Sequence, residues 1–187
     1  MGTVPRRSIP TRRLVLEPAG PQHLPGMWAS IESSANELGE FLAWAIEPRK
    51  EGTRQFLERA VQAWDEGAEW SFAVMLDGRC IGGVGLNYYV PVAEHANLGY
   101  WIKTDHAGRG YTAEAASALA EWAFEELGLH RLELHAASHN HASLKVAAKL
   151  GFQREGLLRE ADYARGGWLD VVAFGLLRSD NRPVLHR

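Results

Sequence analysis

The sequence predicts an α+β domain built around one mixed, mostly antiparallel sheet. Three observations support this fold class. Short apolar or alternating runs on either side of a turn, as around Asp77-Gly78, predict antiparallel strands. Residues 112–127 carry apolar side chains at helical spacing and predict one long helix. The predicted order (strand, helices, several antiparallel strands, helix, strand, helix, two strands) is typical of one α+β domain.

Composition limits the classes of protein to which the chain can belong. Of its 187 residues, 46% are hydrophobic and 23% are charged, as in a soluble globular domain. The 20 basic and 23 acidic residues give a formal net charge of −3, so there is no general attraction to nucleic acid or an anionic membrane. Cys80 is the only cysteine, which favours a reducing compartment. No apolar run approaches the length of a membrane span, and we expect a cytoplasmic protein.

The chain is expected to begin with a loose arm over residues 1–11, followed by a single domain over residues 12–187. Residues 38–44 form an aromatic-rich connection that matches no regular element. On either side of that connection, apolar periodicity predicts a strand at 12–17 and helices at 21–33 and 48–66.

The rest of the chain predicts most of the sheet. Gly128 and Gly151 are expected to end two helices. Glycines inside one strand, at 82, 83 and 85, predict a bulge or a close approach by another group. We expect strands at 70–76, 80–89, 97–102, 131–136, 152–158 and 169–177, and helices at 112–127 and 142–150.

The segment from Leu98 to Ala115 reads as a strand end, a turn that contains Gly108 and Gly110, and a helix. A helix that begins after such a turn presents free backbone N–H groups and a positive dipole end, which suit a phosphate. No Gly-Lys-Ser/Thr follows, so the turn is not a P-loop. Ala113 stands at the third glycine position of a dinucleotide fingerprint and the preceding strands look antiparallel, so the turn is not that fingerprint either.

Three motifs resemble those of one known family. They are Gly108-Arg-Gly-Tyr-Thr-Ala-Glu-Ala115, Asn140-x-x-Ser143 and Leu150-Gly-Phe152. In order and spacing they resemble the acyl-CoA-binding half of the GNAT superfamily of N-acetyltransferases, and within it the ribosomal-protein serine/alanine N-acetyltransferases. The resemblance covers 97–177 and implies a GNAT fold, acetyl-CoA as co-substrate and no metal.

The resemblance also implies roles for individual residues. Asn140 would hold the pantetheine arm, and Ser143 would protonate the leaving thiolate. Two positions depart from the family pattern, because Ala107 lacks the first side chain of the loop motif and Thr112 is bulkier than Gly or Ala. The remaining cofactor-binding residues would be Arg109, Gly110, Tyr111, Thr112 and Ala113 at the pyrophosphate, and the backbones of Trp101, Ile102 and Lys103 along the pantetheine.

A base is needed because only a neutral amine can attack a thioester. By position, the resemblance assigns this role to Asp162, in a loop after the Gly-Phe strand, with Tyr163 as a second candidate and with contact through water as an option. An unperturbed Asp titrates near ~3.9 and is a weak base, which suits an α-amine with a pKa near ~7.8 better than a lysine amine near ~10.4. At neutral pH the free-base fractions of these two amines differ by roughly 400-fold.

Histidines and tryptophans offer further candidates. His130, His135, His139 and His141 lack the helical pair and nearby cysteines typical of a zinc site, although His139 or His141 could assist proton transfer. The tryptophans divide into two expected groups: Trp64, Trp70, Trp101 and Trp122 in the core, and Trp28, Trp44 and Trp168 near the acceptor wall.

The sequence therefore predicts an enzyme that moves acetyl from acetyl-CoA to a primary amine by direct attack in a ternary complex. A backbone N–H near Ile102 would stabilise the oxyanion. The preferred acceptor is a protein or peptide N-terminus. The alternatives are a small amine (an antibiotic, a polyamine or an aminoacyl conjugate) and a non-catalytic acyl-CoA-binding module. No nucleic-acid or membrane partner is expected, and a homodimer is left open.

Overall fold

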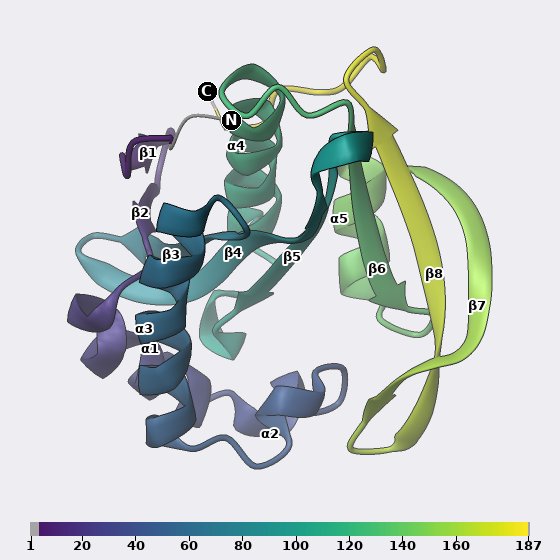
Figure 1. The fold of residues 1–187 in the computed structure, drawn as a ribbon. Helices are drawn as coiled ribbons and strands as arrows, with labels where there is room; N and C mark the ends of the chain where they lie inside the picture. The colour runs from purple at the N-terminus through teal and green to yellow at the C-terminus, as the bar shows by residue number, and fades with distance from the viewer. Residues whose placement is uncertain (1–3, 187) are drawn as a thin grey trace.

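The computed structural model describes residues 4–186, which form an eight-stranded sheet flanked by helices (Figure 1). The strands run in the order β1-β2-β3-β4-β5-β6-β8-β7. Every pair of neighbours is antiparallel except β5 and β6, which are parallel. The expected mixed, mostly antiparallel sheet is thus confirmed.

The first part of the chain supplies one edge of the sheet and the helices beside it. Helices are confirmed where apolar periodicity predicted them, and the aromatic-rich connection 38–44 runs from the end of one short helix, at 35–38, into another, at 43–45. The elements are β1 (Ile9–Pro10), β2 (Val15–Pro18), η1 (Pro21–His23), α1 (Leu24–Glu32), α2 (Ala35–Leu38), η2 (Ala43–Ala45) and α3 (Lys50–Glu66).

The described part of the N-terminal segment is not the loose arm that was expected, and residues 1–3 lie outside the described structure. Ile9 and Pro10 pair with β2. Earlier in the segment, the backbone oxygen of Val4 accepts a hydrogen bond from the Trp64 indole at 2.9 Å. These partners are distant in sequence, so local composition gave no sign of them.

The centre of the sheet is an antiparallel meander of β3 (Trp70–Leu76), β4 (Arg79–Val90) and β5 (His95–Ile102). The short helices η3 (Pro91–Ala93) and η4 (Thr104–His106) precede and follow β5. The predicted hairpin turns at Asp77-Gly78, where both residues adopt positive φ. Each of these strands was predicted to within a few residues.

The last part of the chain alternates helices and strands. Gly128 and Gly151 follow the two helices with φ of 67° and 85°, values at which a side chain is strained, so both act as the expected stops. The elements are α4 (Tyr111–Glu125), β6 (Arg131–Ala137), α5 (His141–Lys149), β7 (Gln153–Ala164) and β8 (Gly167–Leu177).

Strand β7 is longer than predicted, because it continues past Leu158 to Ala164. The register shifts between Leu158 and Asp162, and Glu160 has a φ of 48° within this irregular stretch. The Glu160 N–H donates to the Asp170 carboxylate at 2.9 Å, which stabilises the bulge. Asp162 therefore lies in a strand paired with Leu169, not in the loop that was expected.

Two apolar clusters lie on opposite faces of the sheet. On one face, α4 packs its alanine-rich side against alternate residues of the central strands, such as Leu86 and Leu98. On the other face, α1 and α3 cover a smaller cluster that includes Ala73 and Cys80. A side chain on a central strand can thus be assigned to the α4 face or the α1 face by its position in the alternation.

The feature that matters most for function is a split in the sheet. Strands β5 and β6 pair only over residues 95–97 and 131–133. Beyond that point β5 continues to Ile102 and β6 to Ala137 without pairing to each other. We call the space between these unpaired ends the strand gap.

Candidate active site

The strand gap exposes backbone groups on the side of β5 that faces away from β4. The Lys103 N–H donates to the Ile81 carbonyl at 2.8 Å, so it faces β4 and is not available in the gap. Because backbone groups of successive strand residues point to opposite sides, Trp101 also faces β4, whereas Ile102 and Tyr100 face the gap. Of the three residues expected along a pantetheine arm, Ile102 offers its N–H there. The Lys103 N–H is thus already bonded to β4, and the assignment of these three backbones to the pantetheine stays a prediction.

A candidate anion site lies where the chain turns from β5 into α4, in residues 107–113, which we call the α4 loop. Gly108 and Gly110 have φ of 74° and 82°, and Gly110 is the N-cap of the helix. The Glu114 N–H donates to the Gly110 carbonyl at 3.0 Å, so the N–H groups of the preceding residues, 111–113, have no acceptor within the helix. This arrangement fits a pyrophosphate bound by main-chain N–H groups.

Ser143 and Asn140 lie at the start of α5, on the α4 face. The Asn140 Oδ1 accepts from the Ser143 N–H at 3.0 Å and caps the helix. The capping role and the cofactor role of Asn140 are compatible, because its Nδ2 group remains a possible donor to pantetheine.

Tyr100 joins the two sides of the strand gap. Its hydroxyl lies 2.9 Å from the Ser143 Oγ and also donates to the Ser143 carbonyl at 3.3 Å. Burial raises the pKa of Tyr100 to about 12, although the hydrogen bond to Ser143 lowers it, so the phenol stays protonated at neutral pH. Sequence reasoning placed Ser143 but missed Tyr100, whose role depends on a contact across 43 residues of chain.

Asp162, the predicted base, is exposed. Its carboxylate accepts a hydrogen bond from the N–H of neighbouring Tyr163 at 2.7 Å. It pairs with Leu169, which packs against Ala137 and Phe41 on the α1 face. Since paired residues of an antiparallel ladder share a face, Asp162 lies on the same side of the sheet as that cluster.

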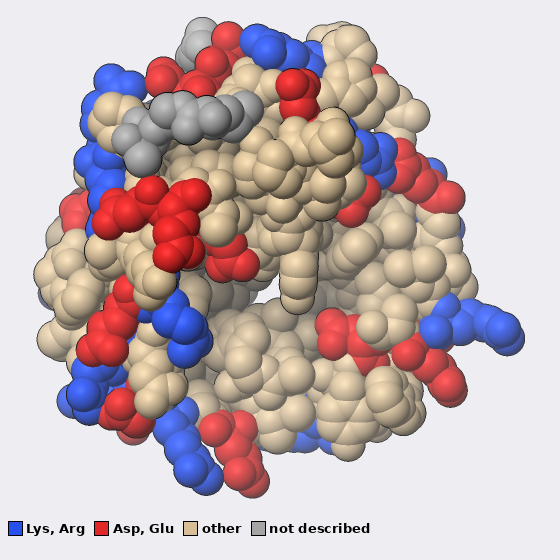
Figure 2. Space-filling model, in the orientation of Figure 1, with Lys and Arg blue, Asp and Glu red and all other residues tan. Residues whose placement is uncertain are grey.

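On the α1 face, the connection 39–46 bridges the two sides of the strand gap. Trp44 meets the β5 side, edge-on to Trp101 at 6.0 Å between ring centroids. Phe41 meets the other side, 5.3 Å from the His139 ring. Figure 2 shows the molecule hollowed here, above the α2 region and between the central strands and β8. We call this hollow the acceptor compartment.

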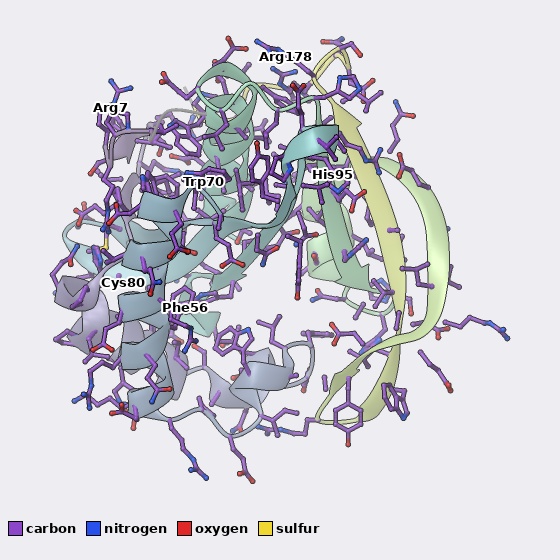
Figure 3. All side chains as sticks on the ribbon, viewed as in Figure 1. Arg7, Phe56, Trp70, Cys80, His95 and Arg178 are labelled. Atoms are coloured by element: carbon purple, nitrogen blue, oxygen red, sulfur yellow. The ribbon has the colours of Figure 1, made fainter. Side chains whose placement is uncertain are left out.

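The tip of the β7–β8 hairpin is hydrogen-bonded to α2 and to the connection 39–46, through contacts of Arg165 that we call the Arg165 clasp. The Arg165 side chain donates to the Ala35 and Ile46 carbonyls at 3.3 and 3.1 Å and to the Asn36 side chain at 3.0 Å. The Arg165 N–H donates to the Gly39 carbonyl at 3.0 Å. The acceptor compartment is therefore bounded below by the Arg165 clasp and above by the β5–β6 pairs, which begin at His95, labelled in Figure 3.

Two further residues face this compartment and were not predicted as parts of the site. On β6, Leu132, Leu134 and Ala136 point into the α4-face core, so exposed His135 lies on the α1 face beside the strand gap. On β5, the Asn97 Oδ1 is buried without a hydrogen-bond partner among the described residues. The strand alternation in the sequence carried the signal for His135.

The tryptophans expected at the acceptor wall have different surroundings. Trp28 packs against the smaller core cluster. Trp168 is 67% exposed and lies edge-on to Tyr163. Of the three, Trp44 is the one in contact with Trp101 at the strand gap.

Within residues 4–186, no three His, Cys, Asp or Glu side chains come together as a metal site. None of the helices in this range combines the length and the apolar character of a membrane span.

Comparison with known proteins decides the family. Residues 13–153 match the model of the acetyltransferase (GNAT) domain. The chain belongs to the GNAT acetyltransferase family. Its co-substrate is acetyl-CoA.

Relatives of this acetyltransferase cover most of its length. It is 30% identical over 172 residues to YdaF of Bacillus subtilis (strain 168), a candidate ribosomal N-acetyltransferase, with 89% of this chain and 90% of YdaF aligned. It is 26% identical to the ribosomal-protein-serine acetyltransferase of Escherichia coli (strain K12), over 84% of this chain and 89% of that relative. The solved structure of the ribosomal L7/L12 acetyltransferase RimL with coenzyme A has the same fold, with a TM-score of 0.87 at 22% identity, over 93% of this chain and 100% of RimL.

Proposed function

We propose that this acetyltransferase transfers acetyl from acetyl-CoA to the α-amine at the N-terminus of a protein or peptide, by direct attack in a ternary complex. One observation carries the proposal: Tyr100 holds the Ser143 hydroxyl at the strand gap, between the anion site on α4 and the acceptor compartment. A thioester in the gap would place its sulfur near Ser143, with the acceptor amine approaching from the α1 face.

The chain's own groups divide the chemistry as follows. The α4 loop binds the pyrophosphate, and the Ile102 N–H stabilises the oxyanion that forms as the amine attacks. As the carbon–sulfur bond breaks, Ser143 donates its proton to the thiolate, and a proton from solvent restores the Ser143 hydroxyl after the products leave. Acetyl-CoA supplies the activated acetyl group.

The proton released by the attacking amine requires an acceptor on the α1 face. We assign this role to Asp162, directly or through a water. His135 faces the same compartment from β6 and is the competing group, because an imidazole ordinarily titrates near ~6.5, closer to neutral pH than a carboxylate does.

The nature of the acceptor is supported by the compartment and by the relatives. The compartment has an aromatic surface formed by Trp44, Trp101 and Phe41. Such a surface suits a peptide better than it suits a small polycation. The relative from Escherichia coli is named for a ribosomal-protein serine, and the RimL structure for an α-amine of L7/L12. A weak base also favours an α-amine over a lysine.

The deciding experiment measures release of the CoA thiol with matched acceptors. Peptides with a free α-amine are compared with the same peptides N-terminally blocked but carrying a free lysine, and with spermidine and an aminoglycoside. We expect turnover with the free α-amine alone, and mass spectrometry should place the acetyl group there. Turnover only with small amines contradicts the proposal, and acetyl-CoA binding without any transfer indicates a binding module.

A further inference from the structure

The carboxylate of Glu114 is the one acidic side chain fully buried in the described structure, at 1% exposure in the first turn of α4. It accepts hydrogen bonds from the Thr11 hydroxyl at 2.7 Å and the Arg13 N–H at 2.8 Å through Oε1, and from the Arg13 Nε at 2.6 Å through Oε2. Burial raises the pKa of Glu114, but these bonds and the charge of Arg13 outweigh it, and the net pKa is lowered. The group is thus a buried, fully bonded carboxylate.

The other end of the Arg13 guanidinium contacts the α4 loop. Its Nη1 donates to the Arg109 carbonyl at 3.1 Å. The guanidinium also lies over the Tyr111 ring, 4.4 Å from its centroid. A Cβ at Gly110 would lie 3.4 Å from Nη2. Arg13 therefore contacts Arg109 and Tyr111, the residues on either side of Gly110, while Glu114 fixes its position.

The bond to the Arg109 carbonyl sets the direction of the next N–H. Because a trans peptide is planar, its C=O and N–H point in opposite directions. With the Arg109 carbonyl turned toward Arg13, the Gly110 N–H is turned away from Arg13, toward the open side of the loop. Ala107 has no polar side chain that could hold the loop from its other end.

We propose that Arg13, held by Glu114, is a positioning residue that orients the Gly110 N–H toward the pyrophosphate of acetyl-CoA. The inference rests on the proposed function only in taking the α4 loop as the pyrophosphate site. It assigns to the N-terminal strand region a part in cofactor binding, although Arg13 itself lies behind the loop.

The test compares a ligand that has a pyrophosphate with one that lacks it. Binding of CoA and of pantetheine is measured by calorimetry without acceptor, for the wild type and for Arg13→Ala. Loss of a positioned donor to a charged group should weaken CoA binding roughly tenfold. Pantetheine binding should change by less than roughly twofold, since it makes no pyrophosphate contact. An equal loss with both ligands, or no loss with either, overturns the proposal.

Two more variants distinguish a specific loss of CoA binding from a general loss of folding. Arg13→Lys keeps a cation beside Glu114 but lacks the planar fork that bonds Glu114 and Arg109 together, so it should fold and still bind CoA weakly. Recovery of wild-type CoA affinity in Arg13→Lys overturns the proposal. Arg7→Ala is the matched control, because Arg7 forms an exposed ion pair with Glu126 away from the loop (Figure 3). Failure of the wild type to bind CoA at all would instead contradict the proposed function.

Discussion

The hydroxyl of Ser143 is placed by contacts from two sides of the split sheet. Asn140 caps α5 through the Ser143 N–H, which fixes the backbone. Tyr100 reaches from β5 to the side-chain oxygen. A serine hydroxyl is free to rotate on its own, and the tyrosine bond removes much of that freedom before the thioester binds.

Replacing Ser143 by Ala should reduce kcat by about 100-fold, the usual contribution of a general acid, and leave acetyl-CoA affinity nearly unchanged. Tyr100→Phe removes one hydrogen bond behind that acid and should cost roughly fivefold in kcat. Steady-state kinetics and calorimetry measure both effects. An unchanged kcat in Ser143→Ala would exclude its role as the acid.

Replacing Asp162 by Asn should reduce the rate most at low pH, where few α-amines are unprotonated. We expect a loss of roughly 100-fold near pH 6 that shrinks to a few-fold near pH 9. His135→Gln is the comparison variant. If Asp162→Asn lowers the rate equally at all pH values and His135→Gln lowers it most at low pH, the base is His135 on β6 and not Asp162.

At the scale of elements, the first turn of α4 depends on a carboxylate that must stay ionised. The folded-state pKa of Glu114 lies below its ordinary value of 4.5. The stabilisation is therefore present above that value and is lost as the pH falls through the folded-state pKa. Glu114→Gln should destabilise the protein by about 1–3 kcal/mol at pH 7. The difference should shrink in urea titrations at about pH 3, and a constant difference would exclude this ionisation as the cause.

Strand β5 has an open position at Gly99, next to Asn97 on the α1 face. A Cβ there meets only the Asn97 Nδ2, at 4.0 Å, and no positive φ requires glycine. Gly99→Val should leave stability and acetyl-CoA affinity unchanged but should raise the KM for acceptor roughly tenfold by filling the compartment. Gly52→Ala on α3 is the control, since a Cβ at that position meets nothing within 4 Å and lies away from the strand gap. An unchanged acceptor KM would place the acceptor elsewhere.

Elements that are formed by contacts between residues near in sequence could be predicted, whereas those that depend on contacts between distant residues could not. Helix α4 and the β3–β4 hairpin were found because periodicity and an Asp-Gly turn are local signals. The far half of β7 was missed because its pairing resumes only after a bulge, at Asp162. The role of Arg13 and the Tyr100–Ser143 contact depend on partners many residues away, so neither followed from the motifs alone.

At the scale of the whole molecule, cofactor binding should join β5 and α5 across the strand gap, where the two strands β5 and β6 no longer pair. A ligand that spans the α4 loop and the strand gap contacts both β5 and α5, and binds only the folded state. Acetyl-CoA at about 100 times its Kd should add ~2.7 kcal/mol, which corresponds to a rise in Tm of about 5–10 °C. ATP and NAD should produce no comparable rise, and an equal shift with ATP would contradict assignment of the loop to CoA.

The Arg165 clasp and the β5–β6 pairs together make the boundary of the acceptor compartment a closed ring of protein. A polypeptide substrate can enter such a closed boundary by its terminus, as a single strand of chain. An internal segment would have to enter as a loop, with two strands of chain passing through the boundary together. Preference for a terminal amine would then begin as a matter of topology, before any side chain of the substrate is recognised.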